Sequence, residues 1–285
     1  HTGGIGTSLE LYPDVTKVKE KEFKATFEIK GKALYGQIPF AIRMMKEILT
    51  ASKLDDEKRL KEILSMTKTR LQDRFLSAGH SAAALRAMSY KSPISKFKDT
   101  TNGIEYYQNI REMEEHFDEK KEEIISGLKV LSELLFRKGN VMISYTASRE
   151  GLAVLEEEIG SLKEALYPER TPESRCILHC EKKNEGFKTS SKVQFAAKAG
   201  NFIDAGEEYN GALQILKVIM SYEYLWINIR VKGGAYGCMS NFNRIGEGYF
   251  VSYRDPNLGR TLEIYDGVPE YLENFTVSER DMTKY

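Results

Sequence analysis

The chain has 285 residues, of which 41% are hydrophobic, and its 42 basic residues balance 42 acidic ones, for a formal net charge of +0. This length is sufficient for two ordinary domains with cores of their own. The balanced charge argues against a nucleic-acid surface, and no apolar run approaches the ~20 residues that span a bilayer. We therefore expect neither nucleic acid nor a membrane as a partner.

The chain begins with a strand-rich region and then changes to a helical pattern. Residues 4–38 are rich in β-forming and alternating apolar side chains, which predicts strands. Pro39 is well suited to the first turn of a helix, and the apolar spacing after it is helical. Asp55 or Asp56 then provides a cap for a second, longer helix.

Further helices and one strand complete the first half. Residues 103–138 predict two helices that are broken near His116. Residues 140–147 alternate Val, Ile and Tyr with polar residues, which predicts a strand, and residues 152–166 predict a charged helix.

A linker divides the chain. Residues 167–175 contain two prolines, are polar and have no periodicity, as is typical of a connection between domains. We therefore predict one domain over residues 1–166 and a second over residues 176–285.

The second half again combines strands and helices, in this order: strands Cys176–Cys180 and Val193–Ala199, helix Glu207–Ile229, a hairpin of Met239–Phe242 and Gly248–Tyr253, and helix Arg260–Phe275. Runs of strands followed by helices predict the α+β class. We expect two related domains, each an antiparallel-rich sheet with helices packed on one face, and both incomplete.

The sequence offers no convincing metal site. Cys176, His179 and Cys180 are close together, but on a strand His179 points away from the two cysteines, and no further ligands follow at zinc spacing. His80 lies among alanines and is typical of a structural histidine. No histidine begins a His-x-x-Glu-His motif. Three cysteines form no disulfide framework and suit a reducing compartment.

Two candidate functional residues lie beside a glycine pair. The predicted helix ends at Gly233-Gly234, with Arg230 before it and Tyr236 after it. Arg presents a charged fork of donors and Tyr a neutral hydroxyl, a combination that can hold a carbonyl oxygen gaining negative charge. A structural interpretation remains open, because Gly commonly ends helices and Arg favours a helix C-terminus.

A phosphate-binding interpretation of this loop is excluded by element order. A phosphate-binding loop runs strand, glycines, helix, with Lys after the second glycine. Here the order is helix, glycines, strand, and Lys232 precedes the glycines. This also excludes a nucleotide-binding or transferase domain built on the loop.

The loop and its flanking motifs resemble a known family. Ile229–Gly237, together with Tyr209–Leu213, Ser252–Asn257 and the weaker Thr2–Ile5, is similar to the C-terminal half of the insulinase-like (pitrilysin) zinc metallopeptidases, in the presequence-protease branch. Members consist of four related α+β domains that close as two halves around a chamber. The zinc site lies in the first domain.

The resemblance implies roles for the parts of this chain. Residues 1–166 correspond to the later part of the third domain and residues 176–285 to the first part of the fourth. Arg230 and Tyr236 match the catalytic Arg and Tyr, and Gly233 and Gly234 are expected to contact substrate. The implied partners are a peptide substrate and the N-terminal half of the same protein. The implied zinc belongs to the full-length protein and is not ligated by this chain.

Both ends have the character of cuts within domains, since the chain starts at His1 without Met and stops in a predicted helix start at residues 278–285. We expect a fragment that is inactive alone and that self-associates. The expected location is cytoplasmic for a bacterial protein, or an organelle matrix. A non-catalytic scaffold or partner subunit of the same fold family is the alternative function.

Overall fold

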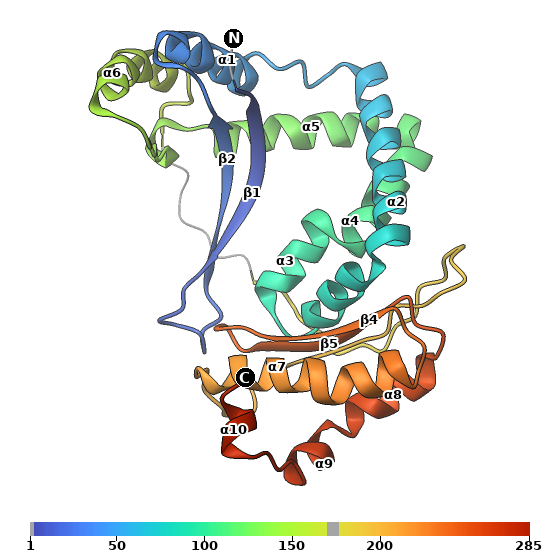
Figure 1. The fold of residues 1–285 in the computed structure, drawn as a ribbon. Helices are drawn as coiled ribbons and strands as arrows, with labels where there is room; N and C mark the ends of the chain where they lie inside the picture. The colour runs from blue at the N-terminus through green and yellow to red at the C-terminus, as the bar shows by residue number, and fades with distance from the viewer. Residues whose placement is uncertain (1–2, 170–176) are drawn as a thin grey trace. The chain divides into compact units, whose positions relative to one another are not determined.

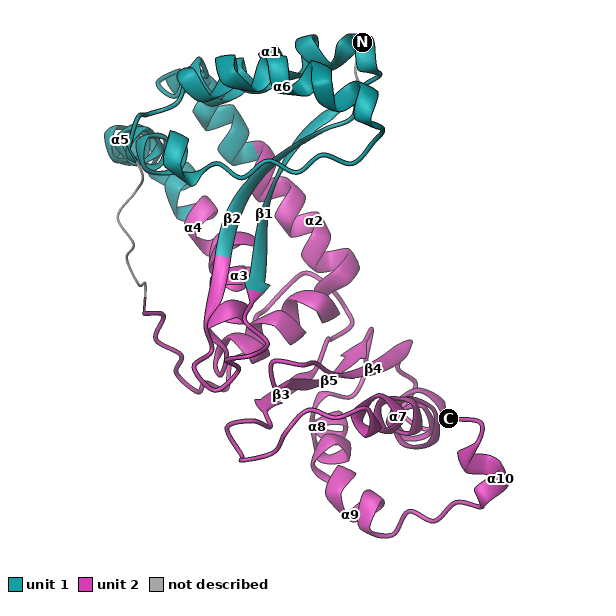
Figure 2. Ribbon diagram, turned by 90° about the vertical axis from the view of Figure 1, so that its left-hand side faces the viewer, with its two compact units in different colours: residues 1–12, 25–65, 112–176 teal, residues 13–24, 66–111, 177–285 magenta. Residues whose placement is uncertain are grey.

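The computed structural model describes residues 3–169 and 177–285. Helices predominate over two small antiparallel sheets, which confirms the α+β class. The chain forms two compact units (Figure 2). Unit 1 comprises His1–Tyr12, Ala25–Ser65 and Glu112–Cys176, and unit 2 comprises Pro13–Lys24, Met66–Arg111 and Ile177–Tyr285.

Unit 1 is built on a hairpin and a helix pair. Its elements, some of which end in unit 2, are β1 (Ile5–Pro13), β2 (Phe23–Gly31), η1 (Tyr35–Gln37), α1 (Ile38–Thr50), the start of α2 (Glu57–Ser89), α5 (Phe117–Leu135), η2 (Lys138–Asn140) and α6 (Arg149–Glu164). Strands β1 and β2 pair with each other. Apolar side chains of α1 and α6 pack into a small core formed by Ile38, Ile42, Leu155 and Leu162.

One predicted strand of this unit is not formed. Residues 141–147 have no regular structure, although their side chains alternate as in a strand. A strand needs a neighbour for its backbone hydrogen bonds, and no described strand pairs with this segment. The alternation of side chains therefore predicted an extended segment, but it does not show whether a neighbouring strand is available to pair with it.

Unit 2 holds a three-stranded sheet between helices (Figure 1). Its further elements are α3 (Pro93–Asn102), α4 (Ile104–Glu115), β3 (Ala197–Asn201), α7 (Ala212–Ile219), η3 (Met220–Val231), β4 (Gly237–Phe242), β5 (Glu247–Tyr253), α8 (Leu258–Asp266), α9 (Val268–Glu273) and α10 (Glu279–Met282). The strand order is β3-β5-β4, and both pairs are antiparallel. The register pairs Cys238 with Ser252, so the predicted hairpin of β4 and β5 is confirmed.

The main core of unit 2 lies between this sheet and the α7–η3 helix. Met220, Leu225 and Ile229 of η3 are almost fully buried and pack with Cys238 and Tyr265. The remaining members of the core are Ala196, Ala235 and Val268. Burial of three large side chains on one helix contributes roughly 1.5–3 kcal/mol for each, which fixes η3 to the sheet.

Helix α2 contacts the sheet through a kink. Ala78 has a non-helical backbone (φ −129°, ψ 37°), and the carbonyl of Ser77 accepts a hydrogen bond of 3.4 Å from the Tyr253 hydroxyl. A Cβ on Gly79 would lie 2.5 Å from the ring of Phe195, so only glycine allows this contact. The small residues around Gly79 thus serve packing, as the sequence predicts.

The compact units follow different boundaries from the predicted sequence domains, because residues 66–111 join the C-terminal sheet in unit 2. The division at residues 167–175 therefore stays a prediction. Most of that linker, and Cys176, lie outside the described residues, while residues 177–180 form no strand. Within the described ranges, no helix is both long and apolar enough to cross a membrane.

Candidate functional site

The predicted helix before the glycine pair has two geometries. Instead of one α-helix over Glu207–Ile229, the structure forms α7 and then the π-helical η3. The amide of Lys232 donates to the carbonyl of Ile227 at 3.0 Å, across five residues, as in a π-helix. Such wide turns are rare and occur frequently at functional sites. The apolar spacing did not distinguish this geometry from an α-helix.

The two glycines are each required for the turn that follows. Gly234 has φ +78°, a left-handed conformation that side chains disfavour. A Cβ on Gly233 would lie 2.5 Å from the carbonyl oxygen of Ile229. The amide of Gly234 also donates to the carbonyl of Arg230 at 2.9 Å, which closes the helix end.

The structure brings Arg230 and Tyr236 together. The Nη1 group of Arg230 donates a hydrogen bond to the backbone carbonyl of Tyr236. The guanidinium carbon lies 4.4 Å from the ring centroid of Trp226 and 5.4 Å from that of Tyr236. Arg230 therefore contacts two aromatic rings, each within the range of a cation–π interaction.

Tyr236 presents its side chain outward from a well-held backbone. Its side chain is exposed, with 65% of the residue accessible. Its amide donates to the carbonyl of Tyr253 at 2.9 Å, and the two rings meet edge to face with centroids 6.0 Å apart. A hydroxyl on an exposed, oriented ring is available to donate a hydrogen bond to a ligand.

The segment after β5 supports the loop, a role that the sequence did not reveal. The side chain of Asn257 donates to the carbonyl of Gly233. Asp255 is fully buried, and its carboxylate accepts from the amide of Asn257 at 2.8 Å and from the hydroxyl of Thr261 at 2.6 Å. The only sequence signal was an Asp-Pro-Asn turn, whose short polar side chains commonly bind nearby backbone.

Burial makes the other ionisable groups behind the loop unreactive. It raises the pKa of the Cys238 thiol to about 11, so this buried cysteine is protonated at neutral pH. Burial also raises the pKa of Tyr265, whose hydroxyl donates to the carbonyl of Ala196 at 3.1 Å. Cys238 and Tyr265 are therefore not candidates for chemistry at the loop, in contrast to the accessible side chain of Tyr236.

The donors of the described residues do not fit a zinc ion. Zinc needs His, Cys or carboxylate groups that converge on one point. No group of three or more such side chains lies together in the described ranges. The ring of His80 faces Phe195 and Tyr253, and burial lowers its pKa. His116 is on another helix start and pairs with Glu119 at 3.6 Å.

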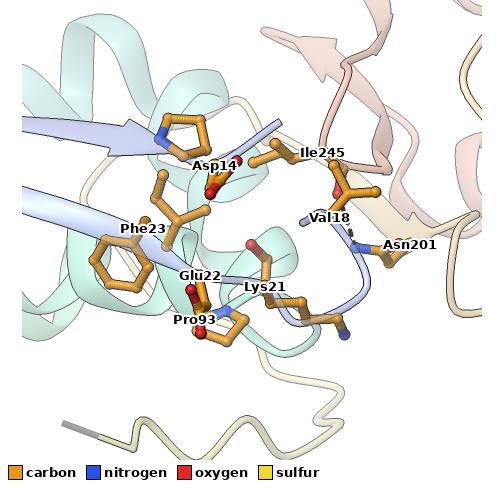
Figure 3. Close-up of a pocket in the computed structure, with 11 residues that line it drawn as sticks. Asp14, Val18, Lys21, Glu22, Phe23, Pro93, Asn201 and Ile245 are labelled. Atoms are coloured by element: carbon orange, nitrogen blue, oxygen red, sulfur yellow. Dashed lines mark hydrogen bonds between the residues drawn. The ribbon is translucent and has the colours of Figure 1, made fainter. Parts of the chain in front are cut away.

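A small pocket elsewhere in unit 2 has a structural explanation (Figure 3). It lies between the turn of the β1–β2 hairpin, the start of α3 and the loops at Asn201 and Ile245. The ammonium group of Lys21, on its rim, pairs with Asp204 at 2.7 Å and donates to the carbonyl of Lys91 at 3.2 Å. These contacts join the hairpin tip to the rest of unit 2.

Comparison with known proteins shows that the chain is similar to parts of longer proteins. Residues 1–113 match a family model for a peptidase-associated domain, and residues 184–285 match the "PreP C-terminal domain". The chain is 37% identical to "Protein HypA" of Clostridium perfringens over 284 residues, which is 100% of this chain and 29% of that relative.

Two organellar proteins are also similar. "Presequence protease 1, chloroplastic/mitochondrial" of Arabidopsis thaliana is 28% identical over 99% of this chain and 26% of its own length. "Presequence protease, mitochondrial" of Kluyveromyces lactis is 25% identical over 96% of this chain and 29% of its own length. The chain thus spans less than a third of each of these curated relatives.

Proposed function

The chain belongs to the insulinase-like peptidases as a presequence-protease-like C-terminal region, and we propose that it supplies the substrate-holding donors of a zinc metalloendopeptidase. The full-length enzyme degrades short unfolded peptides in a closed chamber, and the zinc site is on the N-terminal half. The observation that carries the proposal is the pairing of exposed Tyr236 with Arg230 on a fixed loop.

Tyr236 is proposed to donate its hydroxyl to the scissile carbonyl oxygen. Peptide hydrolysis places negative charge on that oxygen, and a neutral, oriented donor stabilises the charge without repelling any group of the free enzyme. The exposed ring of Tyr236 and its backbone bond to Tyr253 support this role.

Arg230 is proposed to bind a neighbouring carbonyl of the peptide. Its guanidinium has five N–H donors, and one of them is engaged by the carbonyl of Tyr236. Contacts with the rings of Trp226 and Tyr236 restrict the guanidinium, so the other donors keep a defined orientation. Gly233 and Gly234, without side chains, allow a peptide backbone to approach the loop.

The binding of zinc by the full-length enzyme and its cellular location are proposed by analogy with the family. The described donors do not fit zinc, so the metal is proposed to bind outside this chain. Separated from the N-terminal half, the chain is proposed to be inactive. The two organellar relatives support an organelle matrix, and the cytoplasm is the corresponding place in a bacterium.

The decisive test is Tyr236→Phe in the full-length protein. Loss of one such donor typically lowers turnover by about 100- to 1000-fold, and we expect that fall in kcat on a short fluorogenic peptide. Tyr222→Phe is the matched control, because Tyr222 is equally exposed on η3 but outside the loop. If Tyr236→Phe keeps turnover within a few-fold of the parent, the loop is a helix stop and the scaffold alternative is favoured.

A further inference from the structure

Three aromatic rings and two guanidinium groups form a continuous row at the end of the β4–β5 hairpin, which we call the ladder. It runs through Trp226, Arg230, Tyr236, Tyr253 and Arg254. Successive members lie 4.4, 5.4, 6.0 and 5.5 Å apart, measured between ring centroids and guanidinium carbons. The ladder begins with the proposed site and continues beyond it to one further cation.

Arg254, at the end of the ladder, has an unfavourable backbone conformation. Its φ is +48°, and among the described non-glycine residues only Lys21 shares a positive φ. The left-handed region is unfavourable for a residue with a Cβ, and Gly or Asn adopts it more readily. Such strain concentrates at functional sites, which favours a role for the side chain of Arg254.

The position of Arg254 is tied to that of Tyr236. The amide of Tyr236 lies 3.3 Å from the carbonyl oxygen of Arg254, as well as 2.9 Å from that of Tyr253. Both neighbours of the Tyr253–Arg254 pair, Ser252 and Asp255, are fully buried. The strained residue therefore projects from a rigid frame beside the exposed Tyr236.

The two arginines of the ladder have no acidic partner in the described part of the chain. Arg86, by comparison, pairs with Asp99 at 2.6 Å and with Glu185 at 2.9 Å. Asp255, next to Arg254, is buried and is instead bonded to Asn257 and to the hydroxyl of Thr261. Neither arginine therefore forms an ion pair with an acidic side chain of the described residues, and the Arg254 side chain is exposed.

We infer that Arg254 is a further substrate-binding residue, and that it binds a carboxylate of the peptide. A guanidinium fork matches the two oxygens of a carboxylate, and the Tyr253 ring lies within cation–π range of the Arg254 fork. The carboxylate is the free C-terminus of the peptide or an Asp or Glu side chain. The inference rests on the proposed function and narrows its substrate class to peptides with an acidic group near the cleaved bond.

The test compares two peptide pairs on the full-length protein. One fluorogenic peptide is made as the free acid and as the C-terminal amide, and another carries Glu or Gln at one internal position. The variants are Arg254→Gly and Arg254→Asn, which suit a positive φ and so preserve the turn. Arg244→Ala is the matched control, because Arg244 also stacks on a tyrosine, Tyr209 at 5.9 Å, but in the turn at the opposite end of the hairpin.

We expect the parent to prefer the acidic member of one pair in kcat/KM, and both Arg254 variants to reduce that preference about tenfold, chiefly through KM. Arg254→Lys is expected to keep part of the preference for the acidic peptide, and Arg244→Ala to keep all of it. The peptide pair whose preference falls in the Arg254 variants identifies the source of the carboxylate: the C-terminus for the acid and amide pair, or a side chain for the Glu and Gln pair. If both ratios stay within twofold of the parent's in both variants, the inference is overturned.

Each ratio is taken within one variant, so a general loss of activity does not alter it. If Arg254→Gly loses the preference while Tyr236→Phe retains turnover, the carboxylate site is supported and the proposed role of the Tyr236 hydroxyl is contradicted. The converse result would remove the carboxylate site alone.

Discussion

Arg230 combines a structural and a proposed chemical role in one side chain. It lies within cation–π range of the rings of Trp226 and Tyr236 and donates a hydrogen bond to the carbonyl of Tyr236. Lysine has no planar fork and does not reproduce this arrangement. The contacts of Arg230 therefore determine the orientation of its guanidinium group.

Arg230→Ala is expected to lower kcat by roughly 100-fold and to raise KM, because both the fixed donors and the contact with the loop are lost. Arg230→Lys should restore less than a tenth of this loss if the planar fork is what matters. Steady-state kinetics on the full-length protein measures both parameters. Lys232→Ala is the control for charge alone, since Lys232 is an exposed cation of the same loop whose bond is to Asn228. Equal effects of Arg230→Ala and Lys232→Ala would contradict a specific role.

The helix–glycine–strand element is defined by backbone conformation as much as by side chains. The π-helical η3 ends two residues before Gly233, and the chain reverses into β4 through Gly234. The two glycines are needed for different reasons: Gly234 for its positive φ and Gly233 for its proximity to the carbonyl of Ile229. The same substitution should therefore have different effects at the two positions.

Gly234→Ala is expected to lower the free energy of unfolding by about 1–2 kcal/mol, the cost of a left-handed residue, because its Cβ would only touch Pro256 at 3.7 Å. Gly233→Ala should be the more destabilising, because the clash is with backbone. Gly259→Ala, in α8 with open space around it, is the control and should be neutral or stabilising. Denaturant titration of the purified chain gives all three values. The reverse order for positions 233 and 234 would contradict this account of the turn.

At the scale of the whole molecule, parts of the two family-matched segments lie in one compact unit: residues 13–24 and 66–111 of the first segment join residues 184–285 of the second in unit 2. Arg86 on α2 belongs to the first segment, and Glu185, its partner at 2.9 Å, belongs to the second. Arg86 also pairs with Asp99, which is fully buried and accepts the amide of Ile104 at 2.9 Å. Hydrogen bonds from Arg86 hold the pKa of Glu185 below its usual range.

Arg86→Met is expected to destabilise the chain by about 3–5 kcal/mol, because it leaves Asp99 as a buried charge without its partner. Arg59→Met is the control on the same helix, since the Arg59–Glu62 pair is exposed and contributes at most about 0.5 kcal/mol. Denaturant unfolding measures both. An effect of Arg86→Met no larger than that of the control would show that the buried pair is not stabilising.

The same contact predicts a pH dependence. Because the pKa of Glu185 is lowered in the folded state, its contribution is complete above the ordinary carboxyl pKa and is lost as pH falls through the lowered value. The parent should therefore lose stability in that acidic range, and Arg86→Met should lose less.

The sequence by itself determined the local features of this protein. Apolar periodicity predicted α+β elements, the Gly233–Gly234 helix stop and the β4–β5 hairpin, because these depend on contacts between residues close in the chain. The loop motif also predicted that Arg230 and Tyr236 lie together, which the structure supports through their direct hydrogen bond.

Only the tertiary structure decided the features that depend on distant partners. The segment 141–147 has a strand pattern but no described partner, and residues 66–111 join the C-terminal sheet although the two are far apart in the chain. The support of the loop by Asp255 and the alignment of Arg254 with Tyr236 likewise arise from packing. A sequence specifies what each side chain can do, but burial, strain and missing counter-charges exist only once segments far apart in the chain are brought together.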